Sequence, residues 1–305
     1  MTGIFFIMLA CIFWALDTIF RYPLLGMGYS SLQIVWLEHL ILVALTFLWL
    51  WRRGELGTLF HKKYWPAFIV VGCLGSAIGT LAFTKAFSMV NPTIVILLQK
   101  LQPIVAITLA ALWLKESITP RFILWAAVCF VGSFLLMADE LLKFIAENQQ
   151  VVYDESTGLN GYLFALVAVF SWGCATVFGK HLTLQGLNSS VIMGGRFFFG
   201  LIALFPLILI YQETHVIVSP EPDLWMSIIA MVVLSGLLGM AFYYQGLKRI
   251  PSRLSALTEM FFPVAAAGVN WIVLGMGLEM LQILGGIILV TASVQVQRLK
   301  TVQMA

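Results

Sequence analysis

The segment ACIFWALDTIFRYPLLGMGYSSLQI, residues 10–34, is echoed by AVFSWGCATVFGKHLTLQGLNSSVI, residues 168–192. Trp14 is matched by Trp172 at an offset of 158 residues. Further identities at the same offset are Thr18 with Thr176, Phe20 with Phe178, Gly28 with Gly186, Ser31 with Ser189 and Ile34 with Ile192. A register that is kept over this length indicates an internal repeat.

The match continues to the end of the chain at an offset of 160 residues. The pairs there are Gly79 with Gly239, Leu97 with Leu257, Pro103 with Pro263, Ile123-Leu124 with Ile283-Leu284, and Ser133 with Ser293. We therefore divide the chain into a first repeat of five helices (1–139), an external linker (140–159) and a second repeat of five helices (160–305).

The amino-acid composition indicates that these repeats lie in a lipid bilayer. Of the 305 residues, 61% are hydrophobic and only 10% are charged, whereas soluble proteins carry roughly 25% charged residues. So few charges cannot cover a soluble body of this size, which excludes a water-soluble enzyme. A spanning helix needs about 20 apolar residues, and the apolar runs predict ten spans: 3–24, 30–51, 65–87, 92–114, 121–139, 160–179, 189–212, 224–246, 253–275 and 280–297.

Five spans per repeat place the second repeat upside down relative to the first. Basic residues test this prediction, because they concentrate in cytoplasmic loops. Twelve fall on the side of the N-terminus: Arg52, Arg53, Lys62, Lys63, Lys115, Arg121, Lys180, Lys248, Arg249, Arg253, Arg298 and Lys300. Only Arg21, Lys85 and Lys143 fall on the other side. The sequence thus predicts an all-α integral membrane protein of ten transmembrane helices, in two inverted repeats with both termini in the cytoplasm.

Charged residues within spans are costly and mark functional positions. They are Asp17, Glu38, Lys100, Arg196 and Glu259. Asp17 and Arg21 share a helix face, which predicts a gate or structural ion pair with Arg21 reaching the outer surface. The depths and alternating signs of the other four predict two pairs, Glu38 with Lys100 and Arg196 with Glu259. Such pairs either hold helices together or open to bind substrate or exchange a proton.

A central cavity is expected among spans one to four and six to nine, because spans five and ten carry no charge and are expected at the periphery. The candidate substrate-binding or coupling residues are Trp14, Glu38, Gln99, Lys100, Trp172, Arg196, Tyr243 and Glu259. Pro103 and Pro263 interrupt spans four and nine. Each removes one helical hydrogen bond, which predicts a hinge.

The sequence carries no signature of catalysis or of ATP use. It has no Walker-type glycine loop and no H-E-x-x-H motif, its histidines are dispersed, and its four cysteines are isolated in apolar runs. We therefore expect no catalytic residue, no metal, no cofactor and no nucleic-acid partner.

Several local motifs together resemble the drug/metabolite transporter superfamily, in particular its EamA-type ten-helix branch. The motifs are Ile12-Phe13-Trp14-Ala15, Phe170-Ser171-Trp172-Gly173, Gly195-Arg196-Phe197, Leu101-Gln102-Pro103, Phe261-Phe262-Pro263 and Leu114-Lys115-Glu116-Ser117-Ile118-Thr119. The resemblance implies a basket-like bundle with helices five and ten to the side, and a central site for small metabolites that are often exported. Two positions depart from the pattern: Glu38 stands where many relatives have a basic residue, and Met276 stands where the second repeat would repeat Glu116.

The leading hypothesis is a secondary transporter that works by alternating access in the inner or plasma membrane and exports a small organic molecule. Both charge signs and aromatic residues among the cavity candidates favour a zwitterionic or amphipathic substrate such as an amino acid. Energy would come from a proton or an exchanged substrate. The alternatives are a channel-like or structural membrane protein, and an intramembrane enzyme.

Overall fold

The computed structural model describes residues 2–90, 92–147, 155–214, 221–275, 277 and 279–303. Within these ranges the chain is helical and contains no β-strand. The first half comprises α1 (Thr2–Gly26), α2 (Ser31–Arg52), η1 (Leu56–Phe60), η2 (Lys62–Tyr64), α3 (Trp65–Phe68), η3 (Ile69–Ile78), α4 (Gly79–Phe87), α5 (Pro92–Gln99), α6 (Gln102–Trp113) and α7 (Pro120–Glu147). The second comprises α8 (Glu155–Leu184), α9 (Ser189–Ile210), α10 (Pro222–Met231), η5 (Val232–Gly239), α11 (Met240–Arg249), α12 (Ser252–Glu259), α13 (Phe262–Leu274) and α14 (Met280–Gln303).

Nine of the helical stretches described are long and apolar enough to cross a membrane. They agree with the first nine spans predicted from the sequence. The tenth coincides with a shorter apolar helical segment, Met280–Val296. Part of the predicted linker is helical, since α7 runs to Glu147 and α8 begins at Glu155, while the apolar spans on either side are Pro120–Ala138 and Gly158–Leu184. Residues 148–154 lie outside the described residues.

A repeat-related pair of glycines ends the first helix of each half. Gly28 has a φ of +92° and Gly186 a φ of +86°, a backbone conformation that glycine adopts without steric cost. After each glycine the chain turns back, with Tyr29 N–H donating to the Leu24 carbonyl and Leu187 N–H to the Leu182 carbonyl. The matched positions found in the sequence therefore perform the same local task, a helix C-cap.

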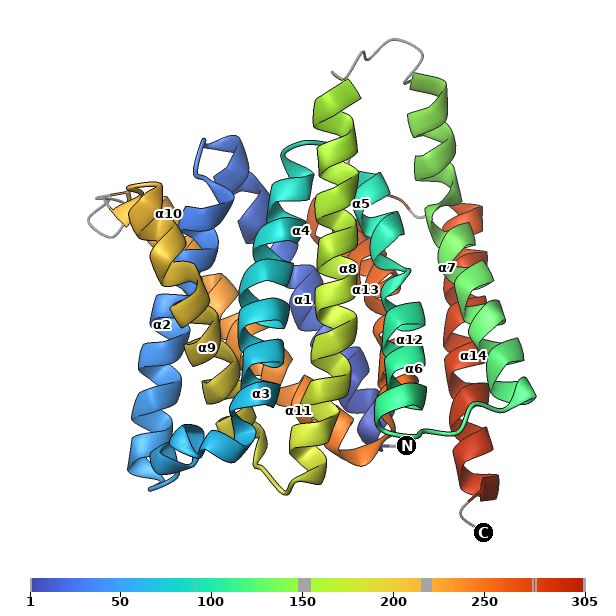
Figure 1. Cartoon of the computed structure of the whole chain (residues 1–305). Coiled ribbons are helices and arrows are strands. Elements are labelled where there is room, and N and C mark those ends of the chain that lie inside the picture. Colours follow the sequence, from blue (N-terminus) through green and yellow to red (C-terminus); the bar gives the residue numbers. More distant parts are fainter. Residues whose placement is uncertain are drawn as a thin grey trace.

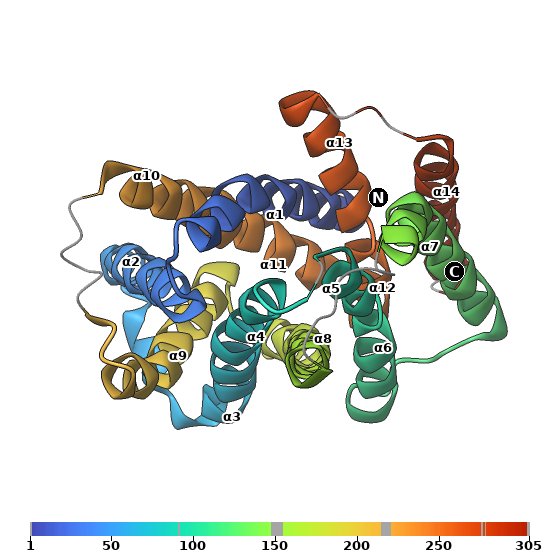
Figure 2. The same ribbon diagram turned by 90° about the horizontal axis from the view of Figure 1, so that it is seen from above.

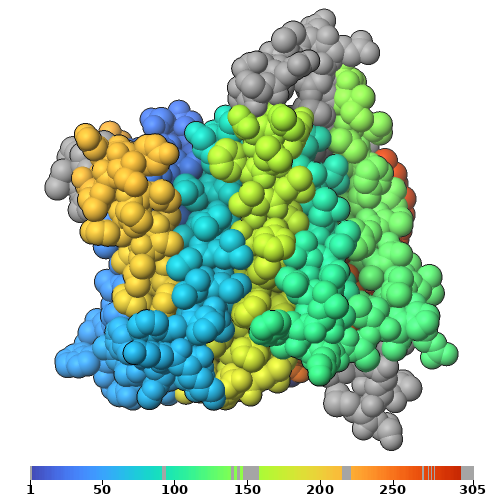
Figure 3. Space-filling model, in the orientation of Figure 1, coloured from blue at the N-terminus to red at the C-terminus, as the bar shows by residue number. Residues whose placement is uncertain are grey.

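The two halves are packed into one another. Helix α1 packs against η5, α11 and α13 of the second half, and α8 packs against η3, α4 and α6 of the first. Figure 1 shows α8 running between α4 and α6, and in Figure 3 its surface separates theirs. Each half thus contributes its first span to a bundle built largely from the other half.

Helices α7 and α14 pack against each other at one edge of the bundle (Figure 2). This agrees with the prediction that spans five and ten are peripheral. The two helices pack closely because glycines of each helix lie against the backbone of the other. A Cβ at Gly285 would lie 2.6 Å from the Gly132 carbonyl oxygen and 2.5 Å from the Leu136 nitrogen.

Replacing Gly285 by alanine should therefore force α14 away from α7. We expect Gly285→Ala to destabilise the protein by about 1–3 kcal/mol, as overpacking generally does, measured as a lower thermal unfolding midpoint in detergent. Gly286→Ala is the matched control, because the Cβ added there would meet no atom closer than 3.8 Å. Equal midpoints for the two variants would contradict this packing.

Candidate functional site

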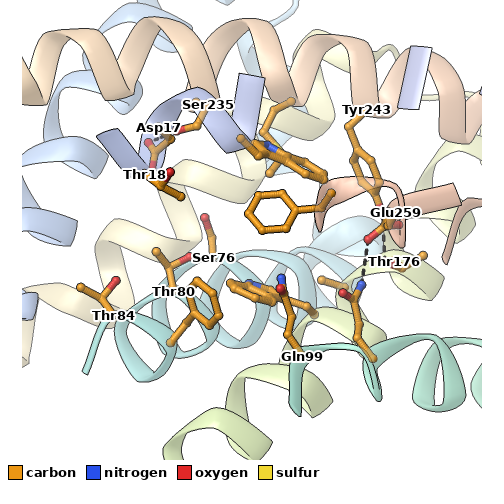
Figure 4. A pocket seen from close by; sticks show the side chains of 18 of the residues that line it. Asp17, Thr18, Ser76, Thr80, Thr84, Gln99, Thr176, Ser235, Tyr243 and Glu259 are labelled. Carbon is orange, nitrogen blue, oxygen red and sulfur yellow. Dashed lines mark hydrogen bonds between the residues drawn. The ribbon is translucent and has the colours of Figure 1, made fainter. Parts of the chain in front are cut away.

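A cavity of about 180 Å³ lies at the centre of the bundle. The described residues that line it come from spans one to four and six to nine, and none comes from α7 or α14. All eight candidate residues line it: Trp14, Glu38, Gln99, Lys100, Trp172, Arg196, Tyr243 and Glu259. Figure 4 shows Asp17 and Ser235 near one end of the cavity and Tyr243, Glu259 and Thr176 near the other.

Two broken helices reach the cavity. Helix α5 ends at Gln99 and α6 begins at Gln102, while α12 ends at Glu259 and α13 begins at Phe262. These breaks occupy matched positions in the two halves and place polar side chains and helix ends beside the cavity. Discontinuous helices of this kind form substrate and ion sites in transporters.

The prolines lie at these breaks. Pro103 and Pro263 are each the second residue of a new helix, so each span is interrupted just before its proline, and a hinge at these positions stays a prediction. The first turn of a helix tolerates proline because its N–H would have no partner there. One carbonyl at such a break is occupied, since the Cys11 thiol donates to the Glu259 carbonyl oxygen at 3.8 Å.

Matched π-helical segments also flank the cavity. Segment η3 (Ile69–Ile78) leads into α4, and η5 (Val232–Gly239) leads into α11. Single π-turns within α-helices are frequent at functional sites. The sequence pattern did not predict them, because the wider turn leaves the apolar composition unchanged.

Aromatic pairs form two walls of the cavity. Trp14 packs on Tyr243 with ring centroids 5.4 Å apart, and Trp172 packs on Phe83 at 4.8 Å. Each indole also covers a glycine of the opposite half: a Cβ at Gly239 would lie 2.8 Å from Trp14 Nε1, and one at Gly79 would lie 2.9 Å from Trp172 Nε1. Phe83 was missed in the sequence, although the offset of 160 matches it with Tyr243.

Arg21 is the centre of a buried charge network. Its Nε donates to Asp17 at 2.7 Å and its Nη2 donates to Glu38 at 2.9 Å. The Ser235 hydroxyl donates to Asp17 at 2.6 Å and joins the second half to this network. The predicted contact of Asp17 with Arg21 is present, but Arg21 is 6% exposed and does not reach the outer surface.

The two predicted pairs Glu38–Lys100 and Arg196–Glu259 are wrong. Among the described residues the ion-pair partner of Glu38 is Arg21. Arg196 donates to the Tyr244 hydroxyl at 3.4 Å and to the Gly75 carbonyl at 3.3 Å. The prediction used the depth of each residue along its helix, and depth does not specify which face of the helix a side chain occupies.

Glu259 and Lys100 have other surroundings. Glu259 accepts a hydrogen bond from Gln102 Nε2 at 2.8 Å, and the hydroxyls of Thr176 and Tyr243 bond each other at 2.9 Å nearby (Figure 4). Lys100 is buried, and its Nζ lies 5.2 Å from the centroid of the Phe262 ring. Within the described part of the chain, Lys100 forms no ion pair.

Glu116 caps a helix of the other half. Its carboxylate accepts hydrogen bonds from the backbone N–H and hydroxyl of Ser252, both at 2.8 Å, and from the N–H of Arg253 at 3.0 Å. A carboxylate at a helix N-terminus satisfies unpaired donors and the helix dipole. Met276, its repeat-related position, lies outside the described residues.

Comparisons with known proteins agree with this geometry. The sequence model of the EamA-like transporter family matches residues 1–138 and 159–296, one stretch in each half. The riboflavin transporter ImpX of Fusobacterium nucleatum is 26% identical over 97% of this chain and 98% of its own length. An uncharacterised transporter of Synechocystis is 25% identical over 80% of this chain and 68% of its own length.

A solved crystal structure has the same fold. It superposes with a TM-score of 0.75 at 16% identity, and the alignment covers 97% of this chain and 96% of the other.

Proposed function

We propose that this chain, which belongs to the EamA-like transporter family, is a secondary transporter that carries a small, flat, amphipathic organic molecule through the central cavity. The observation that carries the proposal is a cavity shared by both halves, with aromatic walls and charged or amide side chains between them. A membrane-embedded cavity with this lining binds the ring of a substrate by stacking and its polar edge by hydrogen bonds.

Alternating access is supported by contacts of different chemistry at matched positions of the two halves. Lys180 donates to the Leu247 carbonyl at 2.8 Å, which ties α8 to α11. The matched positions on α1 and α4 are Tyr22 and Phe87, which make a ring contact with centroids 4.8 Å apart. Both contacts are formed in this structure. Breaking one of them while the other stays would open one end of the bundle, as alternating access requires.

Riboflavin is the first substrate to test, because one relative over the whole chain is named a riboflavin transporter. Purified protein in proteoliposomes should take up riboflavin with saturation, and riboflavin should raise the unfolding midpoint. Empty vesicles are the control. Uptake no greater than in empty vesicles would refute this substrate.

An amino acid is the competing substrate class, favoured by the presence of Lys100 and Glu259 in one cavity. Phenylalanine in the same uptake assay distinguishes the two. Net export, and coupling to a proton or to an exchanged substrate, stay predictions. Uptake with and without a pH gradient tests the coupling, and efflux from preloaded cells tests the direction.

The bias of basic residues supports an orientation with both termini in the cytoplasm of a bacterial inner membrane or a plasma membrane. A reporter that is active only in the cytoplasm, fused after residue 305, should be active. An inactive but expressed fusion would contradict this orientation.

A further inference from the structure

Lys100 stands out among the charged groups that line the cavity. The side chain is buried, yet the described part of the chain offers it the face of Phe262 and no carboxylate within ion-pair distance. Removing an ammonium group from water costs free energy unless its N–H donors are hydrogen-bonded and its charge is paired. Because Lys100 lines the cavity, a bound molecule can supply that partner.

Gln99, the residue before Lys100, supplies a hydrogen-bond acceptor. Gln99 ends α5 and lines the same cavity, and its Oε1 is buried without a hydrogen-bond partner. An amide oxygen accepts, whereas an ammonium group only donates. Two consecutive residues at the break of span four therefore offer one acceptor and one donor to whatever enters.

Most carboxylate oxygens around the cavity are already engaged. Asp17 and Glu38 bind Arg21, and Glu259 accepts from Gln102 with Oε2, which leaves Glu259 Oε1 as the carboxylate oxygen without a hydrogen-bond partner among the described residues. A ligand with a full ammonium group would have to bind at that single oxygen or displace one of the existing donors. A neutral ligand needs only the acceptor of Gln99 and the donor of Lys100, and it leaves the existing pairs intact.

We propose that Gln99 and Lys100 together bind a ring edge on which a carbonyl adjoins an N–H, the chemistry of a lactam or a cyclic imide. Lys100 donates to the carbonyl oxygen, and Gln99 Oε1 accepts from the ring N–H. The ring itself lies between the aromatic pairs Trp14–Tyr243 and Trp172–Phe83. This inference rests on the proposed transport function and adds the groups that select the substrate. Riboflavin carries such an edge on the pyrimidinedione end of its flavin ring.

The test uses riboflavin and riboflavin methylated at its imide nitrogen, titrated into the purified full-length protein while its tryptophan fluorescence is followed. Methylation removes the N–H and leaves Gln99 without a donor, so the wild type should bind the methylated compound about 10-fold more weakly or worse. Gln99→Leu keeps a side chain of similar size and should bind both compounds equally. Lys100→Met should weaken both compounds about 10-fold or more, and the exposed Lys85→Met should weaken neither.

Each outcome bears on the proposal. A wild type that binds both compounds equally overturns it without any variant that could fail to fold. A preference that persists in Gln99→Leu means that the methyl group is excluded by shape, and this also overturns it. No binding of riboflavin at all refutes the proposed substrate together with this inference. Loss of phenylalanine binding in Lys100→Met, with riboflavin binding unchanged, assigns Lys100 to a carboxylate and refutes this inference alone.

Discussion

Replacing Arg21 by methionine should unfold or severely destabilise the protein. The substitution leaves Asp17 and Glu38 buried together without an ion-pair partner among the described residues, whereas Arg21 now binds both, at 2.7 and 2.9 Å. Removing one partner of a buried ion pair typically costs 3–5 kcal/mol, roughly, because the remaining charge is uncompensated. The measurement is the unfolding midpoint of the purified protein in detergent.

A second substitution separates charge from packing. Adding Glu38→Gln to Arg21→Met removes one of the stranded charges and should recover part of the lost stability. Arg53→Met is the matched surface control, since Arg53 pairs with Glu55 at 3.6 Å while its side chain is 52% exposed, and exposed pairs contribute about 0–1 kcal/mol. A double variant no more stable than Arg21→Met would show that lost packing causes the effect.

A methyl group added behind either tryptophan wall should strongly reduce transport while the protein stays folded. In Gly239→Ala the new Cβ would lie 2.8 Å from Trp14 Nε1, and in Gly79→Ala it would lie 2.9 Å from Trp172 Nε1. Each indole must then move, and the aromatic walls that hold the substrate ring are displaced. We expect riboflavin uptake to fall at least about 10-fold in either variant, because small misplacements in a binding site have effects of this size.

The smaller ring of phenylalanine provides the matched rescue. Trp14→Phe in the Gly239→Ala background removes Nε1, the indole atom nearest to the added Cβ. It should restore part of the uptake, which would demonstrate coupling between the two positions. Gly268→Ala is the control, because no atom lies within 4 Å of the Cβ added there. Uptake that is lost equally in Gly268→Ala would point to a general effect on folding.

The arrangement of spans could be predicted because lipid permits so few sequences. Long apolar runs interrupted by Gly28 and Gly186 specify where helices begin and end, and charges that lipid excludes must face a protein interior. For that reason every polar candidate, from Asp17 to Glu259, lines the central cavity.

Partners within the cavity could not be predicted in the same way. The sequence gives the depth of Glu38 and Lys100 along their spans but not the rotation of their helices. In spans three and eight the π-helical segments η3 and η5 change the helical rotation as well. Ser235 shows the problem clearly: an ordinary serine in an apolar run donates to Asp17 of the other half at 2.6 Å. Only the packing of the two halves brings those residues together.

The most direct test of transport by alternating access is riboflavin counterflow in proteoliposomes. Vesicles loaded with unlabelled riboflavin are diluted into labelled riboflavin, and the label that enters is measured against concentration. We expect entry of the label that saturates with concentration, and in Lys100→Met we expect saturation only at about 10-fold higher concentrations or more. Entry that rises linearly with concentration, as through a channel, or entry no greater than in empty vesicles, would contradict the account.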